Sequence, residues 1–141
     1  AEKRGLIDTE YIQRRNEIAK LFREKLSIPG IKFQRIEEDC RSTYKDFSIL
    51  IDEKKFGISR DKLCEALKCE NVMTKKYFYP PIHKQRAYST FLDRYKNVLS
   101  NTEYVSENIL CLPIHSHMTE STAEGICESI VRIKEFCDEI K

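Results

Sequence analysis

Two long amphipathic patterns, one at each end of the chain, bracket a few short apolar segments. Over residues 8–26 the apolar residues recur at helical spacing on one stripe, which comprises Tyr11, Ile18, Ala19, Phe22 and Leu26. Asp8 or Thr9 is placed to cap this helix, and Pro29-Gly30 ends it. The second pattern starts at a predicted N-cap, Thr119, and runs to the end of the chain, with one apolar side that comprises Ala123, Ile126, Cys127, Ile130, Ile133, Cys137 and Ile140.

The segments between these helices have strand-like patterns. Tyr44–Ile51 alternates so that Phe47, Ile49 and Ile51 share one face, and the apolar run Ile109–Leu112 predicts a strand buried on both faces. Further extended segments are predicted at 31–36 and 72–78, the latter ending at two prolines.

Local signals predict the remaining elements. Ser59 is placed to cap a helix over Arg60–Cys69, after a loop over 52–58. A short helical piece is predicted over 83–91 and a polar loop at Ser100-Asn101. Thr102 is then placed to cap a brief helix that ends at Asn108.

This order of elements favours an α+β fold, in which a small and mostly antiparallel sheet is covered by helices on one face. A doubly wound parallel sheet is disfavoured because the chain contains no glycine-rich turn between a strand and a helix. The length of 141 residues suits one domain. The six cysteines include no C-x-x-C pair and are expected to be reduced and buried.

Charge and hydropathy disfavour two classes of partner. The net charge of +2 gives no reason to expect nucleic acid or an anionic membrane as a partner. No apolar run reaches the ~20 residues that a membrane-spanning helix needs, and the charged N-terminus is unlike a signal peptide. We therefore expect a cytoplasmic protein with neither partner.

One segment, Lys75–Tyr88, combines cationic, aromatic and polar residues around Pro80-Pro81. Such a proline-stiffened loop suits a phosphorylated ligand that carries a planar base. The alternative is an edge strand followed by an ordinary solvated loop. An RNA-binding strand that stacks bases on Tyr77 and Tyr79 is disfavoured by the low charge.

The other reactive residue types form no recognisable site in the sequence. His115, His117 and Cys111 lack a second ligand pair at the spacing of a structural zinc site, so we expect no metal. The G-x-S-x-G, P-loop and H-E-x-x-H motifs are absent from the sequence.

Four segments in register resemble the sugar aminotransferases of the DegT/DnrJ/StrS type over nearly the whole chain. The first is R-R-N-E-I-A-K-L-F-R-E-K-L, followed by I-P-G-I; the second is Tyr44–Leu67, a strand followed by an R-D-x-L helix. The third is Y-P-P-I-H-K-Q-R-A-Y, at Tyr79–Tyr88, which is similar to the family's Y-x-P-L-H-x-Q-x-x-Y loop. The fourth is I-L-C-L-P-I-H-S-H-M-T-E, which is similar to the family's L-P-L strand, turn and final helix.

The resemblance implies the C-terminal small domain of a fold-type-I enzyme that depends on pyridoxal phosphate (PLP). Residues 1–28 would form the helix leading into this domain, and residues 29–141 the domain itself. The parent enzyme, usually a homodimer, would transfer an amino group, typically from glutamate, to a nucleotide-linked keto sugar in surface-polysaccharide or aminosugar biosynthesis. The Schiff-base lysine and the other PLP-binding residues would lie in a large upstream domain, so this chain alone is expected to bind no PLP and not to transaminate.

The small domain of such enzymes supplies one wall of the substrate cleft, which makes Tyr79, His83, Lys76 and Gln85 the candidate substrate-binding residues. His83 has an alternative role in holding the backbone near Pro81, and Lys84 does not lie in the family's lysine motif. Separation from the large domain is expected to expose apolar surface around Leu6, Ile7 and Tyr11. The alternative function is a stand-alone domain that binds or regulates through a small molecule without catalysis.

Overall fold

A small antiparallel sheet forms the centre of the fold in the computed structural model, which describes the backbone of residues 2–95 and 98–140 and the side chains from Thr9 onward within those ranges. In the described ranges the strand order is β1-β2-β3, with β1 at Ile31–Phe33, β2 at Phe47–Ile51 and β3 at Ile109–Leu112. The central strand pairs Ile51 with Ile31 on one side and Phe47 with Leu112 on the other.

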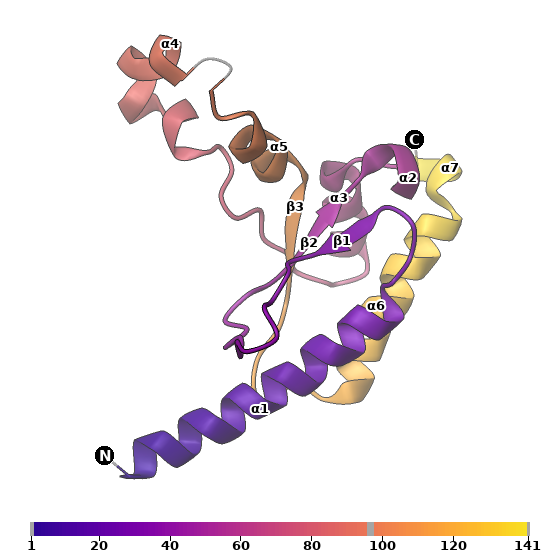
Figure 1. The fold of residues 1–141 in the computed structure, drawn as a ribbon. Coiled ribbons are helices and arrows are strands. Elements are labelled where there is room, and N and C mark those ends of the chain that lie inside the picture. Colours follow the sequence, from indigo (N-terminus) through magenta and orange to yellow (C-terminus); the bar gives the residue numbers. More distant parts are fainter. Residues whose placement is uncertain (1, 96–97, 141) are drawn as a thin grey trace.

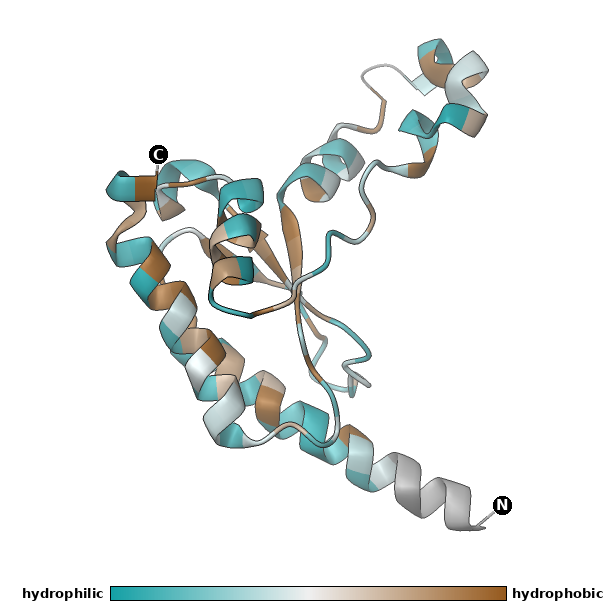
Figure 2. Ribbon diagram, turned by 180° about the vertical axis from the view of Figure 1, so that it is seen from behind, coloured by the Kyte–Doolittle hydropathy of each residue, from teal (hydrophilic) through white to brown (hydrophobic). Residues whose placement is uncertain are grey.

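One face of the sheet is covered by the two terminal helices, α1 (Glu2–Lys25) and α6 (Glu120–Glu135), which lie side by side (Figures 1 and 2). Alternate residues of β2, namely Phe47, Ile49 and Ile51, are buried on this face, as expected for the period of two along a strand. The ring of Phe22 from α1 lies 5.0 Å from that of Phe47. The predicted α+β architecture is therefore confirmed.

Two helix starts follow the predicted capping chemistry. The Ser59 hydroxyl accepts a hydrogen bond from the Lys62 backbone nitrogen at 3.3 Å, at the start of α3 (Arg60–Cys69). The Thr119 hydroxyl does the same for Thr122 at 3.1 Å, at the start of α6. The other helical elements are α2 (Glu53–Phe56), α3 (Arg60–Cys69), the 3₁₀ helices η1 (Ile82–Lys84) and η2 (Arg86–Phe91), α4 (Leu92–Tyr95), α5 (Ser100–Asn108) and α7 (Cys137–Ile140).

The strand predicted over 72–78 is wrong. Only Lys75 in this segment forms a β-bridge, an antiparallel one to Cys111. The segment has strand-forming residues, but a strand also needs a face to bury, and Met73 and Phe78 are both exposed. Beyond the bridge the chain therefore leaves the sheet.

Some element boundaries also differ from expectation. The first helix begins at Glu2, so Asp8 and Thr9 lie inside it instead of capping it. The loop over 52–58 contains the single turn α2, and α5 begins at Ser100, ahead of the predicted cap Thr102. The C-terminal helix is interrupted at Phe136 and continues as α7.

The expected burial of the cysteines is wrong at two positions. Cys40 and Cys69 are exposed, and all six thiols are free. Cys40 lies in the loop between β1 and β2, and Cys69 ends α3, so neither faces the core. Cys111 and Cys127 are buried, as expected.

The apolar surface predicted around Leu6, Ile7 and Tyr11 is partly outside the description, because the side chains of Leu6 and Ile7 are not described. Tyr11 is 39% exposed, and its ring lies 5.5 Å from that of His117.

Every helix in the described ranges is too short or too polar to cross a lipid bilayer.

Two glycines in different surroundings allow a matched test of the fold. Gly30 has φ of +93°, and a Cβ added there would overlap the backbone nitrogen and Cα of Phe56. Gly30→Ala should therefore lower the free energy of unfolding by about 3 kcal/mol or more. At Gly125, inside α6, no described atom lies within 4 Å of the added Cβ. Gly125→Ala should raise the free energy of unfolding by up to about 1 kcal/mol.

The check is urea denaturation of both variants beside the unchanged protein. Equal effects of the two substitutions would contradict the close approach of the turn at Gly30 to α2.

Candidate functional site

All four predicted substrate-binding residues lie on one projecting segment, which we call the arm and which comprises the described residues 76–95 and 98–108 (Figure 1). The arm begins after Lys75, whose backbone N–H and C=O pair with the C=O and N–H of Cys111 at 3.1 and 2.8 Å. It returns to the sheet where α5 runs directly into β3. Both ends of the arm are therefore attached to the same strand.

Tyr79 and Lys76 both lie at the base of the arm and contact the same ion pair. This pair joins Arg60 and Asp61 at the start of α3, with 2.7 Å between Arg60 Nε and Asp61 Oδ1. The Tyr79 ring lies 5.1 Å from Arg60 Cζ and is 55% exposed. The Lys76 ammonium pairs with Asp61, and its hydrogen bond together with the Arg60 charge lowers the pKa of that carboxyl.

His83 and Gln85 lie further along the arm. His83 is only 8% exposed, and its Nε2 lies 3.1 Å from Glu103 Oε1 on α5. Lys84 Nζ lies 3.0 Å from the other oxygen of Glu103. The hydrogen bond from Lys84 makes the largest contribution to lowering the pKa of Glu103, and the hydrogen bond from His83 lowers it further. Gln85 is exposed at the end of η1.

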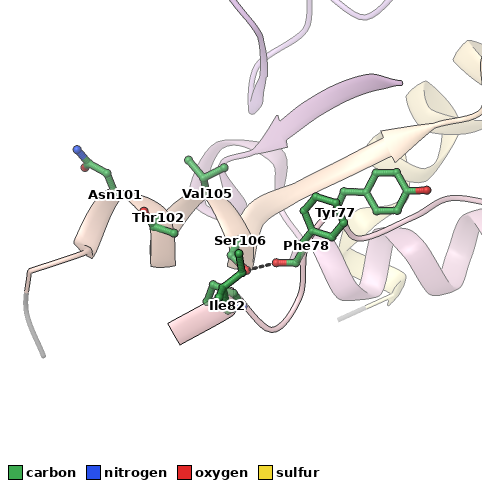
Figure 3. A pocket seen from close by; sticks show the side chains of 8 residues that line it. Tyr77, Phe78, Ile82, Asn101, Thr102, Val105 and Ser106 are labelled. Atoms are coloured by element: carbon green, nitrogen blue, oxygen red, sulfur yellow. Dashed lines mark hydrogen bonds between the residues drawn. The ribbon is translucent and has the colours of Figure 1, made fainter. Parts of the chain in front are cut away.

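An apolar hollow of about 430 Å³ lies between the outgoing chain of the arm and α5 (Figure 3). The Phe78 and Ile82 side chains border it on one side and Val105 on the other. The Ser106 hydroxyl donates to the Phe78 carbonyl at 2.7 Å, which ties the two sides together. None of the four predicted residues is among the described residues that line this hollow.

Sequence reasoning missed three residues that hold the site together, namely Arg60, Glu103 and Ser106. The sequence predicts a helix at Arg60, and only the position of Arg60 in the R-D-x-L motif could have indicated a role in the site. Glu103 and Ser106 lie on a helix whose start was misplaced. Their partners are about 20 or more residues away in the chain, beyond the reach of local patterns.

The surroundings of Lys84 do not fit covalent attachment of PLP. A lysine that forms a Schiff base is activated by a lowered pKa. The hydrogen bond to Glu103 instead raises the pKa of Lys84, with a further contribution from Glu107 at 3.8 Å. Across residues 9–95 and 98–140, the His, Cys, Asp and Glu side chains form no group of three or more that could hold a metal ion.

The Glu103 contacts predict a specific dependence on pH. Because the folded protein lowers the pKa of Glu103 below its ordinary value of 4.5, the carboxylate stabilises the fold above that pH, and this contribution is lost as the pH falls below it. Glu103→Gln should therefore lower the melting temperature at pH 7. The difference in melting temperature between this variant and the unchanged protein should shrink below pH 4.5. Thermal denaturation from pH 3 to pH 7 measures this, with the more exposed Glu107→Gln as control. A difference that is constant across this pH range would contradict the assignment.

Known aminotransferases are similar to this chain in sequence and in fold. A transaminase of Escherichia coli, dTDP-4-amino-4,6-dideoxy-D-glucose transaminase, is 34% identical over 132 residues, which cover 90% of this chain and 35% of the relative. The aminotransferase TlmJ of Streptoalloteichus hindustanus has 25% identity and a TM-score of 0.75, over 93% of this chain and 33% of that structure. DesI, solved in the presence of its TDP-sugar product, has 25% identity and a TM-score of 0.74, over 92% of this chain and 32% of that structure.

The chain spans about a third of the length of the curated relatives it matches. Within that third, the similarity covers almost every element described above. The model of the DegT/DnrJ/EryC1/StrS aminotransferase family matches residues 8–131, from within α1 to within α6. The chain therefore belongs to the DegT/DnrJ/EryC1/StrS aminotransferase family.

Proposed function

We propose that this chain is the C-terminal small domain of a PLP-dependent aminotransferase that transfers an amino group from glutamate to a nucleotide-linked keto sugar. The observation that carries the proposal is the 34% identity to the E. coli transaminase over 90% of the chain. The name of that enzyme specifies a dTDP-linked sugar, and DesI has a TDP-sugar product. We assign the same class of substrate to the protein that contains this chain.

The arm is proposed to form one wall of the substrate cleft. Tyr79 suits this role because its ring is held by Arg60 while more than half of the residue stays exposed. Lys76 brings a cation to the same place, which suits a diphosphate. His83 and Gln85 are the further proposed contacts. Gln85 is exposed, whereas His83 is only 8% exposed and its Nε2 is engaged with Glu103.

PLP is proposed to bind upstream of this chain, because the resemblance implies a Schiff-base lysine in a large upstream domain and the chain spans about a third of its relatives. We assign no step of the PLP chemistry to the described residues. In this proposal residues 1–28 lead into the small domain at 29–141, and a large domain precedes them. The whole enzyme is cytoplasmic, and two copies of it form a homodimer. The 141 residues alone would then bind no PLP and not transaminate.

Substitution of Tyr79 tests the proposed wall in the full-length enzyme. Tyr79→Phe removes the hydroxyl but keeps the ring over Arg60. The KM for the nucleotide sugar should rise about tenfold through the loss of one hydrogen bond, while the KM for glutamate stays unchanged. Steady-state kinetics with each substrate varied in turn measures both constants.

Tyr104→Phe is the matched control, because Tyr104 is a similarly exposed tyrosine of the same arm. An unchanged KM for the nucleotide sugar in Tyr79→Phe, or an equal rise in the control, would contradict the assignment of Tyr79 to the cleft.

A further inference from the structure

We infer that Arg60 is a positioning residue, which holds the two ends of the arm in a fixed relation and so orients Tyr79 toward the substrate. The effect on substrate rests on the function proposed above. Arg60 itself is only 2% exposed, so it acts through the residues that it contacts and not on a ligand.

The contacts of Arg60 reach both ends of the arm from the body of the domain. Its Nη1 donates to the backbone carbonyls of Ser106, near the end of α5, and Ile109, the first residue of β3, at 3.2 and 2.9 Å. Its Cζ lies 5.1 Å from the centre of the Tyr79 ring, on the outgoing side of the arm. One side chain on α3 therefore links the chain that leaves the sheet with the helix that returns to it.

The carbonyls that Arg60 contacts lie where α5 ends and β3 begins. The last carbonyls of a helix lack partners within the helix, so they need another donor. A guanidinium has several donors in a rigid plane, and it can serve these carbonyls, Asp61 and an aromatic face together. Lysine has a single ammonium group and cannot reproduce this arrangement.

A second link supports the same role. Asp61 accepts from Arg60 Nε and also pairs with Lys76, the first residue of the arm. The Ser106 hydroxyl, on the residue whose carbonyl Arg60 contacts, donates to the Phe78 carbonyl. The positions of residues 76–79 and of the end of α5 are therefore coupled through one polar cluster, which comprises Arg60, Asp61, Lys76 and Ser106.

The test uses the full-length enzyme with Arg60→Met, which keeps the bulk of the side chain and removes its donors. Amide hydrogen exchange in peptides that contain residues 76–79 and 100–108 should accelerate about tenfold or more, because unpaired carbonyls favour local opening. The KM for the nucleotide sugar should rise by a similar factor, with the KM for glutamate unchanged. A role in stability alone would not separate the two KM values.

Arg60→Lys is the second variant, for the case that Arg60→Met does not fold. It keeps the charge and one donor group, and it should show the same changes at smaller size. Arg132→Met is the matched control, because Arg132 forms an exposed ion pair with Glu70 away from the arm. It should change neither exchange in the arm nor either KM.

Unchanged exchange in both arm peptides of folded Arg60 variants would overturn the inference. Accelerated exchange with an unchanged KM for the nucleotide sugar would support the link between Arg60 and the arm, and it would contradict the proposed place of Tyr79 in the substrate cleft. The two proposals therefore fail in distinguishable ways.

Discussion

Phe47, Ile49 and Ile51 line the buried face of β2, and water must be excluded from all three if the sheet is to persist. The stripes of α1 and α6 cover this face, and the Phe22 ring packs directly on Phe47. The helices bury their own apolar stripes in the same contact, so the sheet and the terminal helices stabilise each other.

The arm depends on interactions of another kind. It has no apolar layer comparable to that of the body, and many of its large apolar side chains are exposed, namely Phe78, Tyr79, Ile82, Tyr88, Phe91, Leu92, Val98, Tyr104 and Val105 among the described residues. Its base is instead held by the bridge from Lys75 to Cys111 and by the contacts of Arg60. Hydrogen bonds to a buried guanidinium are directional, so they fix orientation more sharply than apolar contact does. This suits the role proposed for the arm, which depends on where its side chains point.

Features with local causes could be predicted from the sequence. The helix over Arg60–Cys69 and the start of α6 follow from capping residues, and β2 and β3 follow from their apolar patterns. The segment 72–78 was mistaken for a strand because β propensity does not say whether a partner strand or a core is available. For the candidate site, the family resemblance predicted Tyr79 and His83 but not Arg60 or Glu103, because long-range contacts leave no period in a sequence.

The most direct test of the central claim is the mass of the polypeptide that carries this chain in its source cells, detected with an antibody against the 141 residues. Borohydride treatment of the captured protein would then reduce any Schiff base between PLP and a lysine. If this chain is the small domain of a larger aminotransferase, the polypeptide should be well over twice as long as this chain, as in the relatives it matches, with PLP attached after reduction. A polypeptide of 141 residues, or a longer one that retains no PLP, would contradict it.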